Sequence, residues 1–129
     1  VAAVANGGKL VRPTVLKSTM TPAGERIDIS PYALQVAREG MRMGATEGTS
    51  VGLNALSFTT IAGKTGTAQL GANNEYHHAW AIGFFPYEKP KYAYVVLMER
   101  GPSTNLIGGI YATYQSLSKL YQTAPEYFE

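Results

Sequence analysis

Residues 61–69, IAGKTGTAQ, place one lysine, one glycine and two threonines at four consecutive positions. The ammonium of Lys64 can hold a carboxylate or a phosphate, and the hydroxyls of Thr65 and Thr67 can donate hydrogen bonds. Gly66 has no side chain, so a ligand could approach the backbone there. The segment is compatible with a phosphate-binding loop, with one edge of an acyl-transfer site, or with an ordinary strand end.

The phosphate-binding loop disagrees with the sequence on both sides of the lysine. Such a loop requires a glycine five positions before Gly63, and Phe58 stands there. It also requires the N-terminus of a helix after the lysine, whereas residues 67–70 lead into a strand and a turn. We therefore reject this interpretation and turn to the elements that must position Lys64.

Three segments read as β-strands, at residues 60–70, 77–86 and 92–99. The connections GANNEY and PYEKP are too short for crossover helices, so consecutive strands should be antiparallel. The second and third strands are almost continuously apolar, which predicts that both of their faces are covered. A layer of helices is therefore expected on each side of the sheet.

Helical patterns lie before and after these strands. The serine and proline at residues 30–31 predict the start of a helix that ends near residues 44–48, with Leu34, Ala37 and Met41 on one face. A second helix is expected over residues 107–122, because apolar side chains recur there at spacings of four, three and four. These side chains are Ile110, Tyr114, Leu117 and Tyr121.

The first 29 residues are expected to carry two smaller features. VAAVANGG reads as the last turns of a helix closed by Gly7, so the start of that helix should lie upstream of Val1. Residues 10–29 suggest a small hairpin-like excursion, in which Pro13 would confine any strand to an edge. The predicted fold class is α+β, an antiparallel sheet flanked by helices. Residues 1–129 are expected to be one segment of a single domain whose other helical layer is mostly absent.

The composition excludes several classes of protein. A hydrophobic fraction of 45% and a charged fraction of 16% describe a globular chain, and no apolar run approaches the length of a membrane span. The net charge of +2 is spread along the chain, which gives no reason to expect nucleic acid as a partner. Without cysteine there is neither a disulfide framework nor a thiolate metal site. We expect no metal and no cofactor.

The acyl-transfer interpretation agrees with the rest of the chain. The Lys-Thr-Gly triplet is one of three signatures of penicillin-binding proteins and serine β-lactamases. IAGKTGTAQ followed by HHAWAIGFFPYEKPKYAYVVLMERG resembles the third-motif strand and the next two strands of class B penicillin-binding protein transpeptidase domains, most closely the elongation-specific penicillin-binding protein 2 type. VAAVANGGKLVRPTV and GMRMGATEGTSVGLN resemble the stretches that precede this strand.

The resemblance implies a role for each residue of the motif in peptidoglycan D,D-transpeptidation. Lys64 would supply the cation near the substrate carboxylate, and the backbone N–H of Thr67 would form half of the oxyanion hole. These two are the candidate catalytic residues. Thr65 and Gly66 are the candidate substrate-binding residues, because the substrate would lie along this strand by β-addition.

The family's other motifs, a nucleophile in S-x-x-K and a hydroxyl in S-x-N, precede Lys-Thr-Gly in chain order. SLSK at residues 116–119 and STN at residues 103–105 both follow it, so we reject both strings. Adjacent strand residues point to opposite faces, so His77 and His78 should not chelate one ion. The aromatic residues of the strands are expected in the core, namely Trp80, Phe84, Phe85, Tyr92 and Tyr94.

The chain should therefore carry one wall of an active site without its nucleophile. The isolated chain should not react with penicillin. A non-catalytic penicillin-sensing protein or a β-lactamase-like homologue would use the same strand and stays open as an alternative. The expected partners are peptidoglycan peptide stems, β-lactams, the missing N-terminal part of the domain and other cell-wall synthesis proteins. The resemblance implies a periplasmic or extracytoplasmic location, with a membrane anchor outside this chain.

Overall fold

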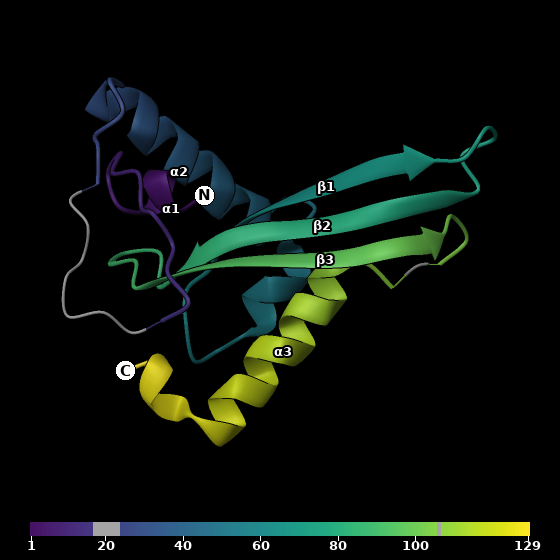
Figure 1. Cartoon of the computed structure of the whole chain (residues 1–129). Coiled ribbons are helices and arrows are strands. Elements are labelled where there is room, and N and C mark those ends of the chain that lie inside the picture. The colour runs from purple at the N-terminus through teal and green to yellow at the C-terminus, as the bar shows by residue number, and fades with distance from the viewer. Residues whose placement is uncertain (17–23, 106) are drawn as a thin grey trace.

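The computed structural model describes residues 1–16, 24–105 and 107–129, and these contain helices around a three-stranded sheet (Figure 1). The sheet has the order β1-β2-β3 and both strand pairs are antiparallel, which confirms the predicted α+β class. Its strands are β1 (Ala62–Leu70), β2 (Tyr76–Phe85) and β3 (Tyr92–Pro102). The helices are α1 (Ala2–Ala5), α2 (Pro31–Thr46), α3 (Gly109–Thr123) and the short 3₁₀ helices η1 (Val51–Ala55) and η2 (Pro125–Tyr127).

The N-terminal segment agrees with the sequence where the structure describes it. Helix α1 is followed by Gly7 at a φ of +79°, the left-handed conformation that glycine adopts readily after a helix. Lys9 and Arg26 form an isolated antiparallel bridge, and the N–H of Leu10 donates to the carbonyl of Glu25 at 2.8 Å. These contacts join the two arms of the predicted excursion, whose turn lies outside the described residues.

Helix α2 begins where the sequence predicted. The Ser30 hydroxyl accepts a hydrogen bond from the N–H of Ala33 at 3.1 Å, and proline occupies the first helical position. The predicted inner face is only partly correct, because Leu34 is buried but Ala37 is exposed. Arg38 occupies the inward position instead, since its guanidinium donates to main-chain carbonyls beneath the helix.

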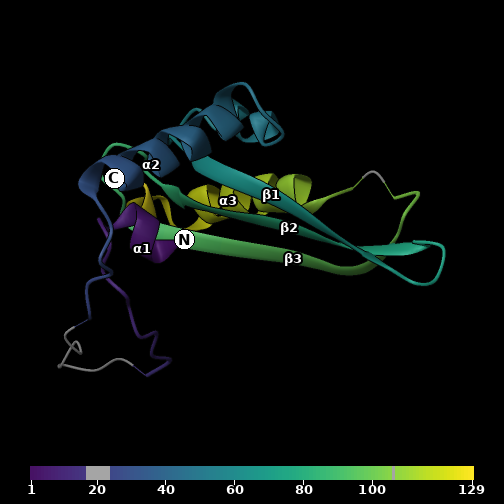
Figure 2. The ribbon, with the colours of Figure 1, turned by 90° about the horizontal axis from the view of Figure 1, so that it is seen from above.

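Two hydrophobic clusters hold the helices against opposite faces of the sheet. One cluster joins η1 and α3 to the sheet, and its buried members are Ala45, Leu53, Leu56, Ile61, Phe85 and Leu117. The other joins α1 to the sheet through Ala5, Ala62 and Phe84, with Met41 of α2 packed beside it. The helices gather around one end of the sheet, while the end with the β1–β2 turn projects beyond them (Figures 1 and 2).

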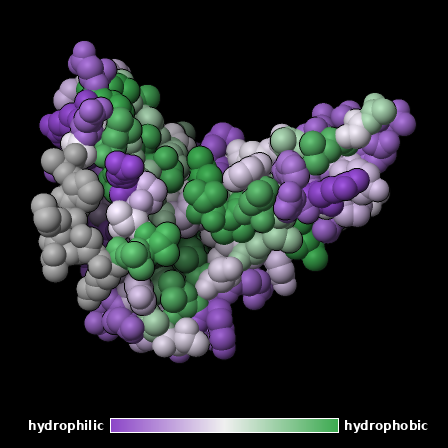
Figure 3. Space-filling model, in the orientation of Figure 1, coloured by the Kyte–Doolittle hydropathy of each residue, from purple (hydrophilic) through white to green (hydrophobic). Residues whose placement is uncertain are grey.

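Part of the sheet is not covered by the described residues. Trp80, Val95 and Leu97 are 37%, 59% and 40% exposed, and hydrophobic surface lies over the middle of the strands (Figure 3). Trp80 pairs with Leu97 in the strand register. The expected layer of helices on each side of the sheet is therefore incomplete over these residues in the described part of the chain. No helix among the described residues combines the length and the apolar character that crossing a membrane requires.

Candidate active site

Lys64, Thr65, Gly66 and Thr67 lie on β1, at an edge of the sheet. They pair on one side with Ile82, Ala81, Trp80 and Ala79 of β2. In the described part of the chain no strand pairs with the other side of β1. This placement confirms that the segment is a strand and not the start of a helix. It also leaves a strand edge to which an extended ligand can add.

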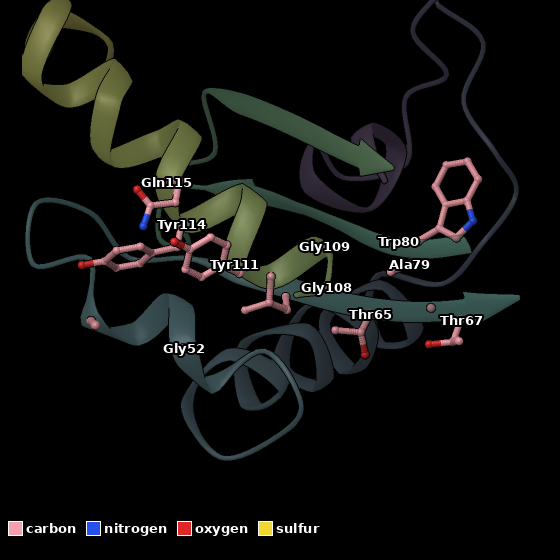
Figure 4. A pocket seen from close by; sticks show the side chains of 13 residues that line it. Gly52, Thr65, Thr67, Ala79, Trp80, Gly108, Gly109, Tyr111, Tyr114 and Gln115 are labelled. Carbon is pink, nitrogen blue, oxygen red and sulfur yellow. The ribbon is translucent and has the colours of Figure 1, made fainter. Parts of the chain in front are cut away.

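The motif presents different groups to the two faces of the sheet. Thr65 and Thr67 point to one side, whereas the Trp80 ring stands on the opposite side (Figure 4). A Cβ atom on Gly66 would lie 3.5 Å from the Trp80 Cβ, so Gly66 faces the Trp80 side, and strand alternation assigns Lys64 to that side as well. The structure thus brings the two hydroxyls together and separates them from the lysine.

The lysine and the first threonine already have hydrogen-bond partners. Lys64 is exposed, and its Nζ atom donates to the carbonyl oxygen of Thr65 at 2.5 Å. The Thr65 hydroxyl lies 2.7 Å from the hydroxyl of Thr49, which is in the turn after α2. Either oxygen of this pair can be the donor. Sequence reasoning missed Thr49, because nothing in its neighbourhood indicates that the turn reaches the strand.

Tyr94 and two glycines support the strand immediately before the motif. A Cβ atom on Gly63 would come within 2.8 Å of the Tyr94 hydroxyl, and one on Gly83 would overlap the Tyr94 ring. The Tyr94 side chain therefore extends from β3 across Gly83 of β2, and its hydroxyl lies against Gly63 of β1. Burial raises the pKa of the Tyr94 phenol far above its ordinary value, so the hydroxyl stays protonated. This position was predicted only as core.

A cavity of about 580 Å³ lies against the threonine side of the motif. Its walls come from η1, from β1 and β2, and from the first turns of α3 (Figure 4). The residues that place chemical groups there are Thr65, Gly66, Thr67, Tyr111, Tyr114 and Gln115. The sequence analysis did not include α3 in the site. The adjacent glycines 108 and 109 could have indicated that this helix approaches the sheet closely.

The rejected serine strings lie outside the motif strand. Ser103 follows the end of β3 and its N–H donates to the carbonyl of Glu75, beside the β1–β2 turn. Lys64 is near the other end of its strand, so the predicted separation is confirmed. Ser116 is an exposed residue of α3, which confirms its reading as a helix residue.

The histidines and aromatic residues are partly as predicted. His78 accepts a hydrogen bond at Nδ1 from the N–H of Arg100 at 3.0 Å, next to a register shift in the β2–β3 pairing. Among the described residues no three His, Asp or Glu side chains form a metal-binding group. Phe84 and Phe85 are buried as expected. Trp80 and Tyr92 were predicted as core and are 37% and 36% exposed. Tyr92 is covered only in part, by the ring of Tyr127 in η2 at 5.5 Å between centroids.

These features belong to one class of protein. The chain is a member of the penicillin-binding protein transpeptidase domain family, whose family model matches residues 1–116.

Two kinds of comparison place the chain within this family. It is 36% identical, over 112 residues, to the peptidoglycan D,D-transpeptidase PbpA of Mycolicibacterium smegmatis, and the match covers 78% of this chain and 22% of that protein. Penicillin-binding protein 2 of Helicobacter pylori aligns with a TM-score of 0.74 and 33% identity, over 95% of this chain and 22% of that one. Penicillin-binding protein A of Mycobacterium tuberculosis, solved as a ceftriaxone acyl-enzyme, aligns with a TM-score of 0.73 and 31% identity, over 89% of this chain and 28% of that one. The chain thus spans about a fifth of the length of its curated relatives.

Proposed function

We propose that this chain is the C-terminal segment of a peptidoglycan D,D-transpeptidase domain of the serine acyl-transfer type. The observation that carries the proposal is Lys-Thr-Gly-Thr on an open edge strand beside a cavity, in a chain of the transpeptidase family. The similarity to proteins named peptidoglycan D,D-transpeptidases favours this function over a penicillin sensor or a β-lactamase.

The proposed reaction begins with a serine hydroxyl supplied by another part of the domain. The serine oxygen attacks the D-alanyl-D-alanine carbonyl, the terminal D-alanine leaves with its amine protonated, and an amine of a second peptide stem then displaces the serine. In this scheme Lys64 contributes positive charge for the substrate carboxylate. The Thr67 N–H stabilises the oxyanion, because a donor fixed in advance costs no reorganisation when the charge develops.

Thr65 and Gly66 have a binding role in the same scheme. The Thr65 hydroxyl is oriented by Thr49 and lines the cavity, so it can donate to a ligand that lies along the strand. Gly66 lets the ligand backbone come close to β1. β-Lactams are proposed as ligands of this site, which the acyl-enzyme complexes of the M. tuberculosis relative support.

The remaining part of the proposal concerns the whole protein. We infer that residues outside this chain carry the nucleophile and cover the open face of the sheet at Val95 and Leu97. The enzyme would act outside the cytoplasm, held at the cytoplasmic membrane by an anchor beyond this segment, with other cell-wall synthesis proteins as partners. It would use no cofactor.

The test is labelling by fluorescent penicillin of three samples: this chain alone, the longest natural chain that contains it, and that longer chain with Lys64→Ala. We expect no labelling of the first and full labelling of the second. The Lys64→Ala protein should label more slowly by about a hundredfold or more, because it lacks a preorganised charge.

A second substitution and two contrary results complete the test. Thr67→Ala should have a milder effect than Lys64→Ala, since the contribution of Thr67 to the oxyanion hole is a backbone N–H. Labelling of the isolated chain at Ser116 would contradict the reading of residues 116–119. Undiminished labelling of the Lys64→Ala protein would contradict the role proposed for the motif.

A further inference from the structure

The cavity beside the motif is larger and more neutral than the binding of a carboxylate alone requires. Its volume of about 580 Å³ is within the range of small-molecule sites, about 300–1,000 Å³. None of the described residues that line it is charged. Most of the lining consists of glycine, alanine and aromatic residues, so a charged group inside would lose its hydration without gaining an ionic partner.

Helix α3 sets the shape of this cavity through a close contact with β2. A Cβ atom on Gly109 would lie 2.9 Å from the Ala81 nitrogen and from the Trp80 carbonyl carbon, so only glycine allows the helix to rest there. The first turns of α3 then stand beside the threonine side of β1. Tyr111 is 55% exposed at the cavity, whereas Tyr114 is half-buried and packs in the core cluster.

We propose that this cavity is a subsite for an uncharged, ring-shaped apolar group of the ligand held by Thr65 and Thr67, and that Tyr111 determines its specificity. The inference rests on the proposed function, because the cavity shares Thr65, Gly66 and Thr67 with the candidate active site. The occupant is thus the part of the ligand that lies on the threonine side of β1, next to the group that the two hydroxyls hold. The neutral walls select against charge, and an exposed tyrosine face favours stacking with a ring, a contact of about 0.5–1.5 kcal/mol.

The first experiment measures the subsite without any acylation. Benzyl alcohol is titrated into the longest natural chain that contains these residues, with ¹³C-labelled alanine and isoleucine methyl groups observed by NMR. We expect shifts at Ala79 and Ile110, which line the cavity, and none at Ile29, which lies outside it. Tyr111→Ala should weaken binding about threefold to tenfold. Tyr32→Ala is the matched control, because Tyr32 is 80% exposed on α2 and should leave binding unchanged.

The second experiment connects the subsite to ligand selection. Two cephalosporins that share an acyl side chain, one with a methyl and one with a phenyl-bearing group beside the ring carboxylate, compete with fluorescent penicillin. The preference for the phenyl-bearing compound should fall several-fold in Tyr111→Ala and stay unchanged in Tyr32→Ala.

The possible results separate this inference from the proposed function. No methyl shifts at Ala79 and Ile110, or an unchanged preference in Tyr111→Ala, would overturn the subsite while leaving the transpeptidase proposal intact. The subsite would also be overturned if another segment of the longer chain filled the cavity and excluded benzyl alcohol. The effect of Lys64→Ala on labelling tests the proposed function by itself.

Discussion

Gly83 is buried in β2 where two other strands converge on it. A Cβ atom there would overlap the Ala62 carbonyl of β1 and the Tyr94 ring of β3. We expect Gly83→Ala to lower the free energy of unfolding by about 1–3 kcal/mol, as overpacking of a core does. Gly40→Ala is the matched control, because a Cβ atom on Gly40 meets nothing within 4 Å and alanine stabilises a helix interior by about 1 kcal/mol. Urea denaturation measures both, and equal effects would contradict the proposed contact.

The Glu88 carboxylate illustrates a second local interaction, outside the active site. The Thr60 hydroxyl donates to it and is the main reason that the Glu88 pKa is lowered; a backbone hydrogen bond and the charge of Arg42 also lower it. Because the pKa of Glu88 is lower in the folded chain than in the unfolded chain, the hydrogen bond stabilises the fold at a pH above the unfolded-state pKa. This stabilisation is lost as the pH falls through the folded-state pKa.

Thr60→Val should therefore raise the pKa of Glu88 towards its ordinary value, as measured by NMR titration of its side-chain carbon. Thr123→Val, on α3, is the control and should leave the Glu88 titration unchanged. Because the carboxylate is exposed, the effect on stability will be small and the pKa is the better measurement. An unchanged Glu88 pKa in Thr60→Val would show that the backbone hydrogen bond is the main cause.

At the scale of elements, Arg38 connects α2 to two other parts of the chain. Its guanidinium donates to the carbonyl of Ala5 at 2.7 Å and to that of Tyr87 at 2.9 Å. It also lies 5.3 Å from the centroid of the Phe84 ring. Arg38→Lys should lower the free energy of unfolding by about 1–3 kcal/mol. The planar guanidinium of arginine donates to two carbonyls in different directions, and the single ammonium of lysine cannot replace both bonds. Arg12→Lys, at an exposed position, is the control in the same denaturation experiment, and a similar loss there would contradict the argument.

At the scale of the whole molecule, the open face of the sheet should govern association with the rest of the domain. Val95 is 59% exposed in β3. We expect Val95→Asp to leave the stability of this chain nearly unchanged, yet to prevent its association with the separately produced remainder of the domain, because burial of an unpaired carboxylate is costly. Co-purification and penicillin labelling of the mixture measure association. Val15→Asp, at a fully exposed position, should associate normally, and equal association of both variants would contradict the inferred interface.

The sequence alone determined the elements and the family. Short apolar runs, polar turns, the serine N-cap and the helical spacing of apolar side chains are local signals, so the three strands, the start of α2 and the position of α3 were predictable. The order of residues 64–67 and their spacing to the later strands were enough to identify the family.

Only the tertiary structure decided which groups share a space. Thr49 joins Thr65 and α3 completes the cavity, because these placements depend on how elements distant in sequence pack. Arg38 replaced Ala37 on the inner face for the same reason, since its partners lie on α1 and beyond β2. Trp80 was expected in the core because a large aromatic residue indicates burial, but burial requires a covering element, and Trp80 is 37% exposed among the described residues.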